Sequence, residues 1–375
     1  MVIDAARQRS VRHLACGAVR FGSVPASLGI SRTALGRSCG WRCEHNPMKF
    51  LVPEPRRHFQ AAPDSCTTGA RLGRGAAPLK LIPCSTLLLL LSTAIGAHAT
   101  SSMREGDVDV GSGVRIHYVD GGDQQAKTTL LFIPGWSMST AVWRDQMYFF
   151  ADSARVVSID PRSQGQSTVT LQSNTPEQRA KDLHEVIKSL VITNVVLVGW
   201  SQGVQDVSAY AAAFNGEGVS GYVLVDAAVG QGAAAAVAQP ELLKGLLERL
   251  VIYQEHQKEY LHGMMNAIIQ SPEGRKRIDE YVQIGLRTPP DLGVSMLMMD
   301  FIAYDRRAAL AKFNRPTLIV AAAQSGELEV QREMSRQIKD AKLEIIDNAG
   351  HAVFIDQPLR FRSLLADFVQ RLGSE

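Results

Sequence analysis

The chain has 375 residues, and its 40 Lys and Arg against 37 Asp and Glu give a net charge of +3. This charge is unevenly placed, because the first 80 residues hold 13 basic and four acidic side chains, while the rest of the chain has a net charge of about −6. The globular part therefore lacks the basic surface typical of nucleic-acid-binding proteins, and we predict no nucleic-acid partner.

The N-terminal region divides into two segments. Residues 1–79 are rich in Arg, Pro, Gly and Ser without apolar periodicity, which predicts a disordered basic leader. The alternative is a translation start downstream of Met1, at Met48 or nearer Lys80, which leaves the leader untranslated. Residues 80–99 combine a basic Lys80, the apolar run Leu87–Leu91 and a small-residue site ending at Ala99, which predicts an export signal cleaved after Ala99. The apolar run is short for a permanent membrane span, so we expect export to the periplasm or the medium without a stable anchor. The alternatives are an uncleaved anchor and a buried helix.

Cysteine usage limits the chemistry of the folded part. All five cysteines precede the expected cleavage site, at positions 16, 39, 43, 66 and 84. Disulfides, thiolate metal sites and a cysteine nucleophile are therefore excluded after residue 99. No HExxH motif, phosphate-binding loop or opening GxGxxG is present, so the sequence predicts neither a metal nor an organic cofactor.

Beyond residue 100, apolar runs alternate with segments of helical composition. Unbroken apolar runs separated by helices are typical of a mainly parallel sheet with both faces covered, which predicts a doubly wound α/β fold. The predicted strands are 113–118, 129–133, 156–159, 194–198, 221–225, 317–322 and 342–346. The predicted helices of this sheet are 176–190, 202–214, 326–339 and 358–372.

Ser201 lies in Gly199-Trp200-Ser201-Gln202-Gly203, a GxSxG motif directly after the strand at 194–198. Glycines on both sides of the serine permit a sharp strand-to-helix turn that exposes its hydroxyl at the edge of the sheet. Ser201 is therefore the predicted nucleophile.

His351 follows the strand at 342–346, in the segment Ala349-Gly350-His351. A serine hydroxyl needs an adjacent base at neutral pH, and an imidazole suits this role. Because the serine comes first in the chain and the histidine last, we predict His351 as the general base.

Together these pieces resemble the α/β-hydrolase superfamily over nearly all of residues 106–373. The resemblance implies an eight-stranded, mostly parallel sheet built from residues 100–226 and 315–375. It also implies a helical lid at 227–314, inserted after the sixth strand, as in capped esterases, perhydrolases and ring-cleavage hydrolases. The segments that carry it are 114–118, 132–136, 160–167, 199–203, 315–318 and 349–351.

The resemblance also implies the remaining site residues. The backbone amides of Trp136 and Gln202 correspond to the family's oxyanion hole. The family's usual acid after the seventh strand is absent here, where the chain reads Ala322-Ala323-Gln324-Ser325. Two carboxylates could replace it: Asp226 at the end of the sixth strand, which we favour, or Glu327.

The segment 227–314 is expected to be helical over 240–259 and 275–285. Its methionines and leucines either line a substrate pocket or form the core of the lid. These residues are Leu261, Met264, Met265, Met296, Leu297, Met298 and Met299.

The predicted function is that of an exported serine hydrolase of the carboxylesterase kind, without a cofactor. Its partner is a small-molecule substrate, a mainly apolar ester or related carbonyl compound cleaved through an acyl-enzyme. One alternative is a cofactor-free perhydrolase with haloperoxidase-like activity. Another is a catalytically inactive binding protein that keeps the fold. The sequence contains no signal for an oligomeric state.

Overall fold

The computed structural model describes residues 102–373. The leader at 1–79 and the export signal at 80–99 lie outside the described residues. Within residues 102–373, no helix combines the length and the apolar character needed to cross a bilayer.

Eight strands form one sheet, in the order β1-β2-β4-β3-β5-β6-β7-β8. The β1–β2 and β2–β4 pairs are antiparallel, and all other neighbours are parallel. This confirms the predicted mostly parallel, eight-stranded sheet. The strands are β1 (Arg104–Asp109), β2 (Arg115–Gly122), β3 (Thr129–Ile133), β4 (Arg155–Ile159), β5 (Val195–Trp200), β6 (Val219–Val225), β7 (Thr317–Ala322) and β8 (Ala341–Ile346).

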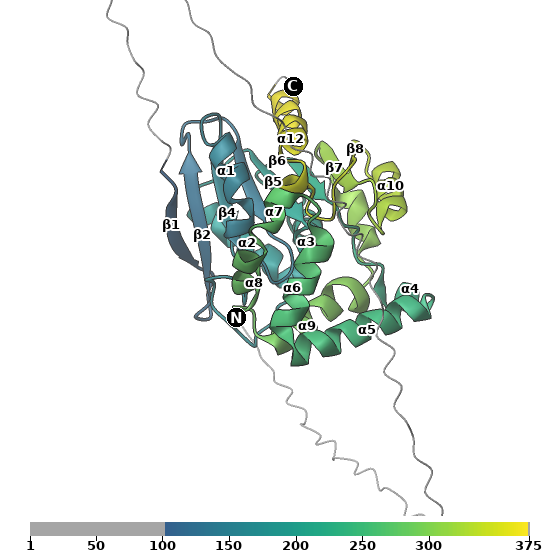
Figure 1. The fold of residues 1–375 in the computed structure, drawn as a ribbon. Coiled ribbons are helices and arrows are strands. Elements are labelled where there is room, and N and C mark those ends of the chain that lie inside the picture. Colours follow the sequence, from purple (N-terminus) through teal and green to yellow (C-terminus); the bar gives the residue numbers. More distant parts are fainter. Residues whose placement is uncertain (1–101, 374–375) are drawn as a thin grey trace, which may run out of the picture. The chain divides into compact units, whose positions relative to one another are not determined.

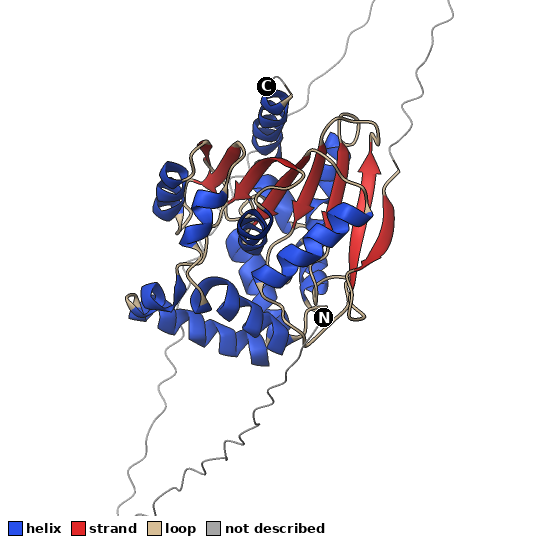
Figure 2. Cartoon of the chain, turned by 180° about the vertical axis from the view of Figure 1, so that it is seen from behind, coloured by secondary structure: helices blue, strands red, loops and turns tan. Residues whose placement is uncertain are grey.

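The central strands are buried along their whole length and mostly apolar, because helices cover both faces of the sheet (Figure 2). Successive side chains of a strand point to opposite faces, so β3 contributes Leu130 and Phe132 to one apolar cluster and Leu131 and Ile133 to the other. The first cluster also holds buried side chains of α1 (Arg144–Phe150) and α12 (Pro358–Leu372). The second holds those of α2 (Pro176–Ser189), α3 (Gln202–Phe214) and α10 (Leu328–Gln337).

Short elements complete this core. The η1 turn (Thr140–Trp143) precedes α1, the η3 turn (Arg307–Lys312) precedes β7, and α11 (Val353–Asp356) precedes α12. Helix α2 begins where expected, because the Thr175 hydroxyl accepts a hydrogen bond from the Gln178 amide and Pro176 occupies the first turn.

Residues 227–314, which we call the helical insertion, lie between β6 and β7. Most of its helices gather at one end of the sheet, where α4, α5 and α9 lie together (Figure 1). The predicted helix at 240–259 is two helices, because the backbone leaves helical geometry at His256. The insertion contains α4 (Gly232–Val237), α5 (Pro240–Glu255), α6 (Gln257–Ile268), α7 (Pro272–Arg275), α8 (Ile278–Gly285), α9 (Pro290–Leu297) and the π-helical η2 (Met298–Ala303).

The insertion begins and ends at neighbouring points. The amide of Arg306 donates to the carbonyl of Gly230 at 2.8 Å, and Gln231 forms an isolated antiparallel bridge with Asp305. The chain therefore leaves the sheet and returns to it side by side.

Candidate functional site

Ser201 occupies a strained turn between β5 and α3. Its φ of 55° and ψ of −115° lie outside the regions that non-glycine residues prefer. The turn is crowded: a Cβ on Gly199 would lie 2.4 Å from the Gly203 carbonyl oxygen, and a Cβ on Gly203 would lie 2.7 Å from the Ile133 carbonyl oxygen. Only glycine fits at these two positions, so the GxSxG pattern is required by packing within the turn and against the end of β3.

Asp226 directly follows β6, the strand beside β5, and its carboxylate is almost completely buried. Its Oδ2 lies 2.9 Å from Nδ1 of His351, while its Oδ1 accepts hydrogen bonds from the Ala322 amide at 2.9 Å and from Gln331 Nε2 at 3.3 Å. The two donors on Oδ1 fix the plane of the carboxylate and direct the other oxygen toward the imidazole.

His351 is held in the loop between β8 and α11. Its carbonyl accepts a hydrogen bond from the indole Nε1 of Trp200 at 2.9 Å, and the amide before it, on Gly350, donates to Asp356 Oδ2 at 2.8 Å. The His351 side chain remains 31 % exposed. A proton on Nδ1, donated to Asp226, leaves Nε2 free to act as a base.

Ser201, Asp226 and His351 line one cavity of about 530 Å³. Parallel strands end at the same edge of the sheet, which is why residues from β5, β6 and β8 meet there. The helical insertion supplies most of the apolar part of the lining. The insertion residues in this lining are Ala227, Leu246, Ala267, Ile268, Gln270, Leu297 and Phe301, and all of them except Gln270 are apolar.

Glu327 also lines this cavity, but its hydrogen bond is to another group. Its Oε2 accepts the Ala228 amide at 2.8 Å, and burial raises the pKa of the Glu327 carboxyl, an effect that the Ala228 amide and the nearby His351 oppose. The structure thus brings Asp226, and not Glu327, into hydrogen-bond contact with His351.

The segments that carry the two expected oxyanion amides both adjoin Ser201. A Cβ on Gly135 would lie 3.2 Å from the Cβ of Ser201, so the loop that carries Trp136 passes directly against the serine. Among residues 102–373 the Trp136 amide has no hydrogen-bond acceptor, and Gln202 begins α3, where an amide has no intrahelical acceptor.

The indole rings of Trp136 and Trp200 are core rather than cavity lining. Trp136 is buried against Tyr253, with ring centroids 4.6 Å apart, and its Nε1 donates to Gly293 of the insertion at 2.9 Å. Met265 and Met296 are fully buried in the same apolar cluster. Of the seven methionines and leucines singled out in the insertion, Leu297 alone lines the cavity at Ser201.

A buried polar network lies behind the site, and sequence reasoning did not find it. The Gln202 side chain donates from Nε2 to Asp300 Oδ2 at 2.5 Å and accepts from Gln164 Nε2 at 2.9 Å. Asp300 belongs to η2 of the insertion and is fully buried. The residue that follows the nucleophile is thereby tied to the insertion.

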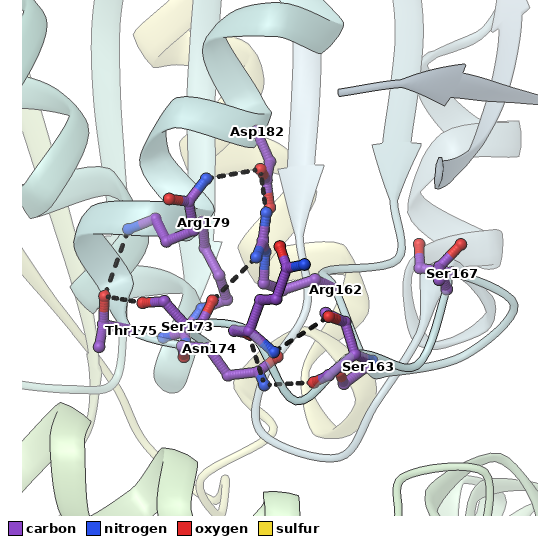
Figure 3. A network of polar contacts seen from close by, with 12 residues as sticks. Arg162, Ser163, Ser167, Ser173, Asn174, Thr175, Arg179 and Asp182 are labelled. Atoms are coloured by element: carbon purple, nitrogen blue, oxygen red, sulfur yellow. Dashed lines mark hydrogen bonds and ion pairs between the residues drawn. The ribbon is translucent and has the colours of Figure 1, made fainter. Parts of the chain in front are cut away.

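Arg179 of α2 is the cation of this network. Its side chain is 2 % exposed and donates to Asp300 Oδ1 at 2.9 Å and to Asp206 Oδ1 at 2.8 Å. A second buried pair, Arg162 with Asp182 of α2, lies beside it (Figure 3). No sequence motif marks these residues, because partners such as Arg179 and Asp300 are 121 positions apart.

The network predicts an unusual pH dependence of stability. Burial and the neighbouring Asp300 and Asp182 raise the pKa of Asp206 to about 7, although Arg179 acts in the opposite direction. In the unfolded chain the Asp206 carboxyl loses its proton near pH 4. Between about pH 4 and 7 the folded protein therefore binds more protons at Asp206 than the unfolded chain does, so this group lowers the free energy of unfolding as pH rises. Asp206→Asn should therefore gain stability relative to the wild type as pH rises, by at most about 1.4 kcal/mol per pH unit.

Urea unfolding of both proteins from pH 4 to pH 7 measures this difference. A stability difference that stays constant across that range would contradict the assignment to Asp206.

Comparison with known proteins places these features in a family. A model of the alpha/beta hydrolase family matches residues 130–364. The bifunctional esterase/perhydrolase of Acinetobacter calcoaceticus is 34% identical over 123 residues, which are 32% of this chain and 44% of that protein. This match thus spans less than half of that relative's length.

Two further similarities extend over more of the chain. Epoxide hydrolase 3 of Xenopus tropicalis is 27% identical over 308 residues, covering 75% of this chain and 80% of that protein. The crystal structure of an esterase from Exiguobacterium antarcticum superposes with a TM-score of 0.63 at 19% identity, covering 71% of this chain and all of the other. At that identity the likeness is one of fold.

Proposed function

The chain belongs to the alpha/beta hydrolase family, and we propose that it is a serine hydrolase that cleaves small, mainly apolar esters or related carbonyl compounds. One observation carries this proposal: the 2.9 Å hydrogen bond between Asp226 and His351 borders the same cavity as the strained Ser201. A serine, an imidazole and a carboxylate in this arrangement form the parts of a nucleophilic triad.

In the acylation half-reaction, Oγ of Ser201 bonds to the substrate carbonyl carbon while its proton passes to Nε2 of His351. The negative charge that develops on the carbonyl oxygen is stabilised by the amides of Trp136 and Gln202. The carbon–oxygen bond to the alcohol then breaks, and the leaving alkoxide takes the proton from Nε2. Asp226 stabilises the imidazolium throughout.

Deacylation repeats these steps with water. His351 takes a proton from the water molecule, whose oxygen bonds to the acyl carbon, and the bond to Oγ of Ser201 breaks as the proton returns to it. The carboxylic acid leaves and the free enzyme is restored. The apolar cavity lining supports substrates with few charges.

A second activity of the same site is perhydrolysis, which the similarity to a bifunctional esterase/perhydrolase favours. Here hydrogen peroxide replaces water and attacks the acyl carbon, so that a peracid leaves in place of the acid. Acetate and peroxide with bromide and a halogenation indicator would reveal this activity.

Active-site labelling is the direct test of the proposed hydrolase. We expect a fluorophosphonate to add one adduct to the folded wild-type chain, seen by intact mass, and no adduct to Ser201→Ala. The reason is that only a serine activated by an adjacent base reacts rapidly with this reagent. Ser208 is a buried serine outside the cavity, so Ser208→Ala is a control that should still be labelled. An unlabelled wild type would contradict the proposal and favour a binding protein without turnover.

A further inference from the structure

A second cavity of about 250 Å³ adjoins the cavity at Ser201. The two cavities share four lining residues, Leu246, Phe301, Gly326 and Glu327, so they adjoin at these residues. Leu246 of α5 and Phe301 of η2 belong to the insertion, while Gly326 and Glu327 follow β7. The boundary between the cavities therefore lies between the insertion and the sheet edge.

The lining of the second cavity is apolar over most of its extent. Helix α4 has the sequence Gly-Ala-Ala-Ala-Ala-Val, and its Ala235 and Ala236 present only methyl groups to the cavity. Leu242 and Leu243 of α5 and Val330 of α10 form other parts of the wall. Small side chains on α4 thus leave a space that is bordered by the larger side chains of α5 and α10.

We propose that this second cavity, named here the α4–α5 subsite, binds the distal end of an apolar acyl or alkoxy chain whose ester carbonyl lies at Ser201. The inference rests on the proposed function and specifies its substrate class as esters with a medium-length hydrocarbon chain. The lining residues shared with the Ser201 cavity favour the substrate as the occupant. The small volume and apolar wall suit a hydrocarbon chain.

Glu327 stands at the boundary that such a chain must pass. One of its carboxyl oxygens is held by the Ala228 amide, and burial raises the pKa of the group, which favours the uncharged form. A neutral carboxyl costs less to cover with hydrocarbon than a carboxylate does. The boundary is therefore compatible with an apolar chain.

Chain-length dependence tests the proposal. We expect kcat/KM of the wild type to rise about fourfold for each added methylene that the subsite buries. This rise should be seen in p-nitrophenyl esters from acetate to octanoate or in a series of n-alkyl acetates. Ala236→Phe should fill the subsite and remove this rise. Ala234→Phe is the matched control, because Ala234 lies on the same helix, is exposed and does not line the cavity.

The inference is overturned if Ala236→Phe and Ala234→Phe give the same octanoate-to-acetate ratio and the same ratio among alkyl acetates. Should Ala236→Phe fail to fold in a thermal-unfolding assay, Val330→Trp fills the subsite from α10 and gives the same test. Failure of the proposed function would give a different result from failure of the subsite proposal. The wild type would then hydrolyse none of these esters and take up no fluorophosphonate.

Discussion

Asp226→Asn should lower kcat for ester hydrolysis by about 10⁴-fold, an effect of the size that loss of the triad carboxylate has in serine proteases. The Ala322 amide and Gln331 Nε2 both donate to Oδ1 of Asp226, so the oxygen of the new carboxamide must stay on that side. Its NH₂ group then faces His351 Nδ1 and donates to it. The imidazole proton is forced onto Nε2, where the base must be free.

Glu327→Gln is the matched variant for this prediction. Its carboxamide oxygen can still accept the Ala228 amide, so we expect kcat to fall by less than about tenfold. Initial rates with p-nitrophenyl acetate at pH 8, together with thermal unfolding of each variant, measure both effects. If Glu327→Gln lost activity and Asp226→Asn kept it, the roles of the two carboxyl groups would be exchanged.

Arg179→Met should lower the free energy of unfolding by about 3–5 kcal/mol at pH 8, which would be a large fraction of the stability of a typical domain. The substitution removes the guanidinium that pairs with both Asp206 and Asp300 and leaves two buried carboxylates without their ion-pair partner. The loss should shrink toward pH 5, because protonation of these carboxyl groups removes the uncompensated charge. Because Asp300 also holds the Gln202 side chain, esterase activity should fall in the folded fraction.

Arg336→Met serves as the control for the Arg179 substitution. Arg336 pairs with Glu333 in α10, three residues before it, and its side chain is 67% exposed. Such surface pairs contribute about 0–1 kcal/mol, so the free energy of unfolding of this variant should be close to that of the wild type. Urea unfolding at pH 8 compares the two, and equal losses would show that the Arg179 network does not stabilise the fold.

Much of the fold was predictable because its signals are local. Apolar strands such as β5 and β7 are buried on both faces and have unbroken hydrophobic sequences. The missed strand is β1, whose sequence Arg-Glu-Gly-Asp-Val-Asp buries only Val108. It is an edge strand with one neighbour, and the pairing with β2 that defines it is a tertiary contact.

The candidate site likewise contains residues marked by local sequence signals and residues placed by tertiary contacts. The Ser201 turn is marked by a five-residue motif, and His351 is marked by its position after the last strand. Which carboxyl group reaches His351 depends on how β6 and β7 end side by side, so sequence alone left Asp226 and Glu327 both open. Asp300 and Gln331 could not be found at all, since each acts through a partner about 100 positions away.

The two ends of the helical insertion are adjacent, so the length of the insertion can change without a change in the sheet. Because the chain leaves at Gly230 and returns at Arg306 across a single 2.8 Å backbone hydrogen bond, residues between these points can lengthen, shorten or diverge without altering strand register. Ser201, Asp226 and His351 all lie outside this segment. Insertion residues that make no hydrogen bond to the sheet can therefore change the lining of the cavity while these three residues keep their places, whereas Asp300, which holds Gln202, is constrained.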